Sequence, residues 1–281
     1  MSEMQATLRQ DVHFEGVGLH TGAPCRARVQ PAPPNSGLTF RLPGGVAFPA
    51  TAEYVIETAR ATVLGKDGVS VSTVEHLLAA IFGCGITNAT ISIEGPEVPV
   101  ADGSAKEFVE AIARVGVAPQ SEVRRRLVLS KPLFARDGDR CIVALPASSF
   151  RIKFMADFAP PVNAQYIDCE MSSEYFMQEI AGARTFGYLH EVEALRKRGL
   201  AQGGSLENAV VFGPDGPMQP LRWPNEVVRH KVLDLMGDFA LLGGWPQFEV
   251  IAVKSGHKLH CIAAVELRKQ FAMTLPEAKV R

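Results

Sequence analysis

The spacing of apolar and polar residues predicts two successive units that end in the same order of elements. In the first half, Gly and Pro turns separate strand-like runs, and a helix, a strand and a second helix follow. The expected strands are 6–13, 25–29, 38–41, 61–64 and 89–93, and the expected helices are 73–82 and 104–114, the latter with Ser104 as its N-cap. The second half predicts strands at 126–129, 141–145, 151–158 and 248–253, a mixed segment at 172–212, and helices at 226–242 and 256–267.

The repeated helix–strand–helix ending indicates a weak internal duplication, visible in the order of elements rather than in residue identity. We expect an α+β fold of two layered units, each with helices over one face of its sheet. The expected domains are 1–120 and 126–281, with the boundary at about 118–126. Two such units facing each other would form a cleft between them.

The predicted helix 226–242 carries three polar residues, His230, Asp234 and Asp238, at intervals of four. This spacing places them on one helical face, while the rest of the helix is apolar. Polar groups on a helix this apolar need partners when they are buried, and a bound metal would satisfy them together. The alternative is a pair on the helix surface, which stabilises a helix by only a few tenths of a kcal/mol.

A second apolar helix begins near Glu75 and His76. Two histidines and an aspartate, His76, His230 and Asp234, would hold one Zn²⁺ and leave a coordination position open, with a glutamate beside it. Ser72 and Glu75 also have the spacing of a capping box, in which the glutamate only closes the start of the helix. Both interpretations remain open on the residues alone.

Composition and charge narrow the class of protein. The chain has 281 residues, 47% hydrophobic and 21% charged, as expected of a soluble globular protein. Its net charge of -1 gives no general attraction to nucleic acid or to an anionic membrane, and the run Arg124-Arg125-Arg126 is expected to be a solvated linker. No apolar run approaches the length of a membrane span, and the polar N-terminus lacks an apolar signal core.

The cysteines are odd in number, widely spaced and without a Cys-x-x-Cys motif. This pattern favours reduced thiols in the cytoplasm over a disulfide framework or a thiolate metal site. The five are Cys25, Cys84, Cys141, Cys169 and Cys261.

Six motifs occur in order along nearly the whole chain. They are the segments GVGLHTG from Gly16, STVEHLLAA from Ser72, GPEVP from Gly95 with DGSA from Asp102, ARTFG from Ala183, RHKVLD from Arg229 through Gly237-Asp238, and KSGH from Lys254. In this order they resemble the motifs of the UDP-3-O-acyl-N-acetylglucosamine deacetylase (LpxC) family, whose members remove an N-acetyl group in the committed step of lipid A synthesis. Any one motif is modest evidence, whereas six in order are specific.

The resemblance implies a duplicated α/β sandwich of the ribosomal protein S5 domain 2 type, with the active site in the cleft. It implies one Zn²⁺ per chain held by His76, His230 and Asp234, and Glu75 as the general base. It also makes His257 the general acid, although a plain helix cap is the alternative. The predicted helix start at His257 would lower its pKa, and pairing with Asp238 would oppose this.

Further roles follow from the same resemblance. Thr185 would help to hold an oxyanion, unless it is an ordinary strand threonine, and Phe186 would pack on the hexosamine. Lys231 and Lys254 resemble diphosphate contacts, with salt-bridged surface lysines as the alternative. Asp157 and Phe158 would lie on the uridine side. His20 would line the phosphate end or serve only as a turn residue.

The segment 189–211 resembles the family's inserted unit, which forms a passage for the 3-O-acyl chain. A bound acyl chain would gain roughly 0.8 kcal/mol per buried CH₂, so such a passage would select chain length. The sequence departs from the family pattern at 61–63, which lacks a doubled Thr, in the Pro-rich 213–223 link, and after His257. The passage positions are Leu189, Val192, Ala201, Ser205 and Val211.

These observations predict a cytoplasmic, monomeric zinc amidase that acts on UDP-3-O-acyl-N-acetylglucosamine. It is expected to bind no nucleic acid and to have no membrane span. One alternative is a zinc deacetylase for a different acylated nucleotide sugar. The other is a binding homologue without catalysis, which should have lost the base or the acid, yet Glu75 and His257 are both present.

Overall fold

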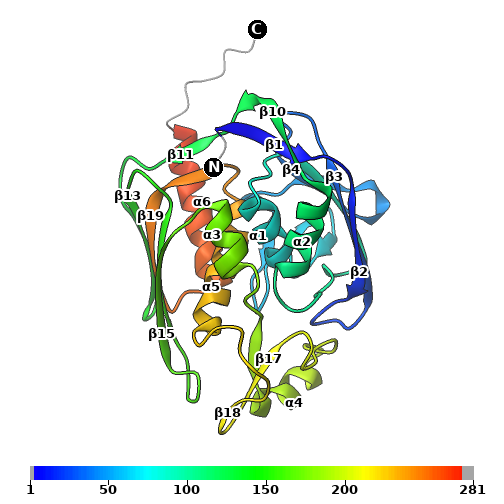
Figure 1. The fold of residues 1–281 in the computed structure, drawn as a ribbon, viewed down its shortest axis with the longest axis vertical. Coiled ribbons are helices and arrows are strands. Elements are labelled where there is room, and N and C mark those ends of the chain that lie inside the picture. Colours follow the sequence, from blue (N-terminus) through cyan, green and yellow to red (C-terminus); the bar gives the residue numbers. More distant parts are fainter. Residues whose placement is uncertain (1–2, 274–281) are drawn as a thin grey trace.

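Two β-sheets lie on opposite sides of a central layer of helices in the computed structural model, which describes residues 3–273 (Figure 1). One sheet comes from the first half of the chain and the other from the second half. The helices of each half cover the inner face of its own sheet, so the two halves meet through their helices. The predicted α+β class is therefore confirmed.

The two large sheets share one strand order. In the first, the order is β2 (Val12–Val17), β3 (Pro24–Pro31), β9 (Ala89–Glu94), β4 (Leu38–Arg41) and β5 (Ala47–Pro49). In the second, it is β12 (Leu133–Asp137), β13 (Arg140–Pro146), β19 (Trp245–Val253), β14 (Arg151–Asp157) and β15 (Ala164–Glu170), with β11 (Arg126–Val128) beside the start of β19.

In both sheets the last strand along the chain is inserted at the centre. In the first sheet it runs parallel to β4 and antiparallel to β3, and in the second it runs parallel to β14 and antiparallel to β13. The outer pairs of both five-strand orders are antiparallel, whereas the additional strand β11 runs parallel to β19. The duplication expected from the order of elements is confirmed in this topology. The division into domains 1–120 and 126–281 stays a prediction, and residues 1–2 and 274–281 of those bounds lie outside the described residues.

The helices between the sheets are α1 (Glu75–Gly83) and α2 (Lys106–Val115) from the first half and α5 (Glu226–Ala240) and α6 (His257–Met273) from the second. α5 packs against α1 and α6 and is buried on nearly all sides, with only Arg229 and Lys231 partly exposed. Alternate residues of β19, including Phe248, Val250 and Ala252, are buried. One continuous apolar core thus joins both halves.

Shorter elements complete the fold. β1 (Met4–Leu8) pairs with β10 (Val117–Val123), and β6 (Val55–Glu57), β7 (Val63–Lys66) and β8 (Val69–Val71) form a small sheet. A third small sheet, β16 (Phe186–Tyr188), β17 (Val210–Gly213) and β18 (Gly216–Pro217), carries α4 (Leu189–Lys197) and lies below the central helices in Figure 1. The remaining elements are short helical segments: η1 (Pro43–Gly45), η2 (Ala52–Tyr54), α3 (Ser173–Tyr175) and η3 (Phe176–Ile180).

Several local predictions were wrong. The single strand expected at 6–13 is two strands, because β1 ends at Leu8 and pairs with β10, whereas β2 begins at Val12 and pairs with β3. Ala105, not Ser104, is the N-cap of α2, although the Ser104 hydroxyl accepts a hydrogen bond from the Lys106 amide at 3.1 Å. Arg124 is not solvated: it is buried, with its guanidinium 4.6 Å from the centre of the Trp245 ring.

Among the described residues, no helix combines the length and the apolar character needed to cross a membrane.

Candidate metal centre and active site

Most of the predicted functional side chains line one cavity of about 780 Å³, where α1 and α5 meet α4 and the β16–β18 sheet. The cavity is the place where the two halves and the inserted unit come together. The predicted residues on its wall are His20, Glu75, His76, Phe158, Thr185, Phe186, Leu189, Val192, Ala201, Ser205, Val211, His230, Lys231, Asp234 and His257.

Three buried side chains at the floor of the cavity form a cluster that could hold a metal ion: His76, His230 and Asp234. The Asp234 Oδ1 atom lies 3.3 Å from His230 Nε2 and 3.7 Å from His76 Nε2. This oxygen is buried and has no hydrogen-bond partner in the described part of the chain. A buried carboxylate oxygen without a donor is costly, so a cation between the three residues would satisfy it.

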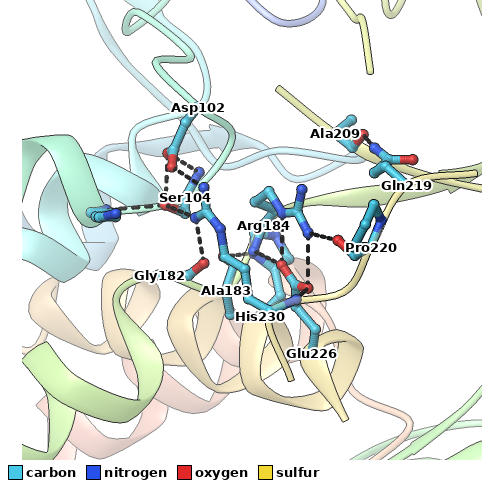
Figure 2. Close-up of polar contacts among 12 residues, drawn as sticks. Asp102, Ser104, Gly182, Ala183, Arg184, Ala209, Gln219, Pro220, Glu226 and His230 are labelled. Atoms are coloured by element: carbon cyan, nitrogen blue, oxygen red, sulfur yellow. Dashed lines mark hydrogen bonds and ion pairs between the residues drawn. The ribbon is translucent and has the colours of Figure 1, made fainter. Parts of the chain in front are cut away.

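The tautomer of His230 is set by the backbone of a neighbouring segment. His230 Nδ1 lies 3.0 Å from the carbonyl oxygen of Ala183, so Nδ1 carries the proton that is donated to that oxygen (Figure 2). The Nε2 atom is then left with its lone pair toward Asp234. A hydrogen bond of this kind from the second ring nitrogen is the usual support of a metal-ligating histidine.

The protonation states of His230 and Asp234 suit metal binding. Burial lowers the pKa of His230 to about 4, so its imidazole is neutral at neutral pH. Burial would raise the pKa of Asp234, but His230 and Lys231 hold it well below its ordinary value. Lys231 Nζ contacts the other carboxylate oxygen, Oδ2, at 2.6 Å. Neutral imidazoles and an ionised carboxylate are the forms that coordinate metals.

Glu75 begins α1 beside the cluster and does not cap the helix. The N-cap is Val74, without a side-chain hydrogen bond, and Glu75 Oε2 instead accepts from the Thr62 amide at 3.1 Å. The capping-box interpretation of Ser72 and Glu75 is therefore wrong. Burial raises the pKa of Glu75 above its ordinary value, although His257 and His76 act in the opposite direction. A carboxylate with a raised pKa at a cavity wall is suited to accept and release a proton.

His257 begins α6 on the other side of Glu75. Its Nε2 lies 3.7 Å from Glu75 Oε1, and its Nδ1 lies 2.9 Å from Asp238 Oδ2. Burial lowers its pKa, but Asp238 and Glu75 outweigh burial and raise the pKa to about 9. The opposition from Asp238 that the sequence analysis expected is present, and Glu75 acts in the same direction. His257 is protonated at neutral pH and can donate a proton into the cavity.

Asp238 lies behind His257 and is not on the cavity wall. It accepts from two further groups besides His257: His260 Nδ1 at 2.8 Å and Thr62 Oγ1 at 2.5 Å. The Nε2 of His260 is 3.0 Å from Ser255 Oγ. Sequence reasoning missed His260 and Thr62 as partners. The His257-x-x-His260 spacing on one helix was the available signal for His260, since residues three apart share a face.

The predicted contacts around Phe186 also meet in the cavity. The rings of Phe186 and Phe158 are 5.0 Å apart edge to face, and the Lys231 ammonium lies 5.9 Å from the centre of the Phe186 ring. Thr185 precedes Phe186 on the same wall, and its amide donates to the Gly103 carbonyl at 2.7 Å. The substrate roles of these residues stay predictions.

Two predicted substrate residues, Lys254 and Asp157, do not line the cavity. Lys254 pairs with Asp157 at 2.7 Å and with Asp139 at 3.1 Å, and these pairs raise its pKa above the ordinary value. The salt-bridged state considered for Lys254 is therefore present, and its contact with a diphosphate stays a prediction. By contrast, Arg60 and Arg140 line the cavity and were missed, because loop and strand-start positions carry no periodic signal.

The turn that contains His20 is fastened by Glu97, which is fully buried. The Glu97 carboxylate accepts from the His20 amide, the Thr21 amide and hydroxyl, and the Thr73 hydroxyl, at 2.7–3.2 Å. A Cβ at Gly18 would collide with this carboxylate, so only glycine fits there. Glu97 thereby fixes the His20 turn against the segment that leads into α1.

The inserted unit supplies the apolar part of the cavity. The positions predicted for an acyl passage, at 189, 192, 201, 205 and 211, all line it, and sequence reasoning missed several neighbours that do the same. The missed neighbours include Tyr188, Leu195, Arg196, Leu206 and Met218.

Comparison with known proteins agrees with this site. Residues 5–269 match a family described as "LpxC: UDP-3-O-acyl N-acetylglycosamine deacetylase". Similar proteins named UDP-3-O-acyl-N-acetylglucosamine deacetylase include one from Geobacter sp. (strain M21), 45% identical over 272 residues, which are 95% of this chain and 89% of the relative. Another, from Nostoc sp. (strain PCC 7120 / SAG 25.82 / UTEX 2576), is 44% identical over 267 residues, which are 91% of this chain and 95% of the relative.

A third, from Saccharophagus degradans (strain 2-40 / ATCC 43961 / DSM 17024), is 42% identical over 278 residues, which are 95% of this chain and 90% of the relative. The family match and these similarities extend over both large sheets and the inserted unit. The resemblance stated from the ordered motifs is confirmed: the chain belongs to the LpxC family of UDP-3-O-acyl-N-acetylglucosamine deacetylases.

Proposed function

We propose that this chain is a zinc-dependent hydrolase that removes the N-acetyl group of UDP-3-O-acyl-N-acetylglucosamine, the committed step of lipid A biosynthesis. The products are acetate and the free amine of the sugar. The observation that carries the proposal is the buried, unpartnered Oδ1 of Asp234 between the Nε2 atoms of His76 and His230. Membership of the family supplies the substrate.

Zinc fits these three residues better than a hard cation such as Mg²⁺, because two of the donors are imidazole nitrogens. Two ligand atoms about 2.1 Å from a tetrahedral zinc lie about 3.4 Å apart. The separations of 3.3 Å and 3.7 Å at Asp234 Oδ1 are close to that value. Three protein ligands with one open position are typical of hydrolytic zinc sites.

When bound, zinc would act as a Lewis acid that activates water at neutral pH and polarises the acetyl carbonyl. Glu75 would take a proton from the attacking water, because its carboxylate faces the cavity beside His76. Thr185 would donate a hydrogen bond to the oxyanion that forms as water adds to the carbonyl carbon. As the C–N bond breaks, His257 would give its proton to the leaving amine.

The remaining residues would bind the two ends of the substrate. Within the cavity, Lys231 and His20 would face the diphosphate, Phe186 would pack on the sugar, and Phe158 would lie toward the uridine. Lys254 and Asp157, which pair with each other outside the cavity wall, would contact the diphosphate and the uridine where the substrate extends beyond it. The inserted unit would bind the acyl chain. We further propose a monomer in the cytoplasm; the five free cysteines support the compartment.

The direct test is acetate release from UDP-3-O-acyl-N-acetylglucosamine by the purified protein, with zinc, after chelation and after zinc is restored. Release that follows zinc is the expected result, and Asp234→Asn should lose both the metal and the activity. A wild-type protein that holds one zinc but releases no acetate would overturn the substrate assignment and favour another acylated sugar. Equal release with and without zinc would overturn the metal assignment.

A further inference from the structure

A network of two ion pairs surrounds the backbone that contacts His230 (Figure 2). One pair joins Arg184 to Glu226, the first residue of α5, and the other joins Arg222 to Asp102. The network contains Asp102 and Arg184, two residues of the sequence motifs to which the proposed chemistry gives no task. It therefore connects a loop of the first half to the segment 182–185 and to the start of α5.

The Arg184–Glu226 pair is buried and has a forked geometry. Arg184 Nε donates to Glu226 Oε1 at 2.8 Å, and Nη2 donates to Oε2 at 3.1 Å. The Arg184 amide adds a third hydrogen bond to Oε1 at 3.1 Å, and the Arg222 amide donates to Oε2 at 2.6 Å. Burial would raise the pKa of Glu226, but these hydrogen bonds lower it below the ordinary value, so it is ionised.

Arg222 extends the network to the first half of the chain. Its Nη2 donates to Asp102 Oδ2 at 2.8 Å, and its Nη1 donates to the Gly182 carbonyl at 2.7 Å. Asp102 in turn accepts from the amide and hydroxyl of Ser104 at 3.0 and 2.7 Å. The network therefore grips the chain at Gly182 as well as at Arg184, on both sides of Ala183.

Ala183 is the residue whose carbonyl accepts from His230 Nδ1 at 3.0 Å. Ala183 directly precedes Arg184, and His230 follows Glu226 by one helical turn on α5. The acceptor and the donor of this hydrogen bond are therefore each next to one partner of the same ion pair. Thr185, the next residue after Arg184, is anchored by its amide to Gly103. A single network thus fixes Ala183, whose carbonyl contacts the proposed metal ligand His230, and Arg184, which precedes the proposed oxyanion donor Thr185.

A buried ion pair is a weak means of stabilising a fold, because desolvation offsets much of the attraction and an apolar pair of similar volume often does as well. The forked Arg–carboxylate geometry instead fixes direction. The arrangement of Arg184 around Glu226 fits that second role, since its side chain and its own amide grip one carboxylate.

We propose that Arg184, Glu226, Arg222 and Asp102 are positioning residues that hold the Ala183 carbonyl against His230 and thereby set the metal affinity of the site. This inference rests on the proposed function and deepens it. Loss of an outer partner of a metal ligand costs roughly 10–100-fold in metal affinity. The network would act through Ala183, and none of its four residues lines the cavity.

The experiment compares Glu226→Gln, Arg184→Lys and Asp102→Asn with wild type in metal-free protein titrated with Co²⁺ against a chelator. Arg184→Lys keeps the charge but loses the fork, so a purely electrostatic or stabilising role predicts wild-type affinity for it. Glu179→Gln is the control, because Glu179 pairs with Arg229 of α5 at 2.8 Å without touching Ala183. We expect the first two variants to bind Co²⁺ about 10-fold or more weakly, Asp102→Asn less so, and the control as wild type.

The second readout is the tautomer of His230 in metal-free protein, from ¹⁵N NMR. Wild type should hold the proton on Nδ1, and Arg184→Lys should show a mixture. If Glu226→Gln does not fold, Arg184→Lys and Asp102→Asn decide the question. Unchanged Co²⁺ affinity and an unchanged tautomer in the folded variants would overturn the positioning role while the metal site stands. A wild-type protein that binds no Co²⁺ would overturn the metal site itself and this inference with it.

Discussion

Gly237 of α5 lies against the backbone carbonyl of Glu75, the first residue of α1. A Cβ at this glycine would collide with that carbonyl oxygen and with the Glu75 Cα. The absence of a side chain therefore allows the two helices to approach closely at this point. Because His76 follows Glu75 and Asp234 lies one turn before Gly237, this contact also sets the distance between the ligands from the two halves.

Gly237→Ala should therefore destabilise the fold by about 1–3 kcal/mol through overpacking. Helix propensity alone predicts the opposite result, because alanine is favoured over glycine within a helix by about 1 kcal/mol. A loss of stability would therefore indicate overpacking. Chemical denaturation measures the change, and metal titration should show weaker binding. Gly213→Ala is the control, since its nearest neighbours are at an ordinary 3.8 Å. A Gly237→Ala protein as stable as wild type would show that α1 and α5 adjust freely.

Glu75→Gln should retain the metal and lose activity. The amide keeps the shape of the carboxylate but cannot accept a proton, so kcat should fall on the order of 10²–10⁴-fold while the bound metal stays at the wild-type level. Steady-state kinetics and elemental analysis give the two values. Glu193→Gln, an exposed residue paired with Lys197, should behave as wild type. Near-normal turnover of Glu75→Gln would remove Glu75 from the role of base.

The protonation of His257 should depend on Asp238. In metal-free protein the pKa of His257 is about 9, above its ordinary value, because the two neighbouring carboxylates outweigh burial. The stability that this ring gains from ionisation is thus fully present below its unfolded pKa and is lost as the pH rises through about 9. Asp238→Asn should lower the pKa and move that loss to lower pH.

NMR titration of His257 and denaturation at several pH values measure this effect. Asp168→Asn removes an exposed carboxylate that pairs with Arg151, far along the sequence from His257, and serves as the control. A His257 pKa that stays near 9 in Asp238→Asn would assign the raised pKa to Glu75 alone.

The sequence predicted the parts of the site that depend on local periodicity. The interval of four between His230 and Asp234 requires only a helix, and the apolar neighbours indicate burial. The fold class followed similarly from the repeated order of elements. The missed strands β12 and β15 are half-exposed and alternate weakly in sequence, so their pairing depends on neighbours that the sequence does not reveal.

The parts that could not be predicted depend on contacts between distant segments. Thr62 donates to Asp238 across 176 positions, and Arg124 packs against the ring of Trp245, which lies on β19 far along the sequence. A run of three arginines looks solvated in sequence, yet the aromatic face of a distant strand covers one of them. The capping motif at Ser72 and Glu75 was misleading for the same reason, because Thr62 competes for the carboxylate.

The passage in the inserted unit should select the length of the acyl chain. Val211 lines the cavity on β17, so Val211→Trp should shorten the space available to the chain. Each CH₂ that is excluded loses about 0.8 kcal/mol, or about fourfold in kcat/KM. A series of substrates with increasing 3-O-acyl length should therefore show a shorter optimum, with little change for the shortest chains. Val128→Trp, at an exposed position of β11, is the control, and an equal loss for every length would place the acyl chain elsewhere.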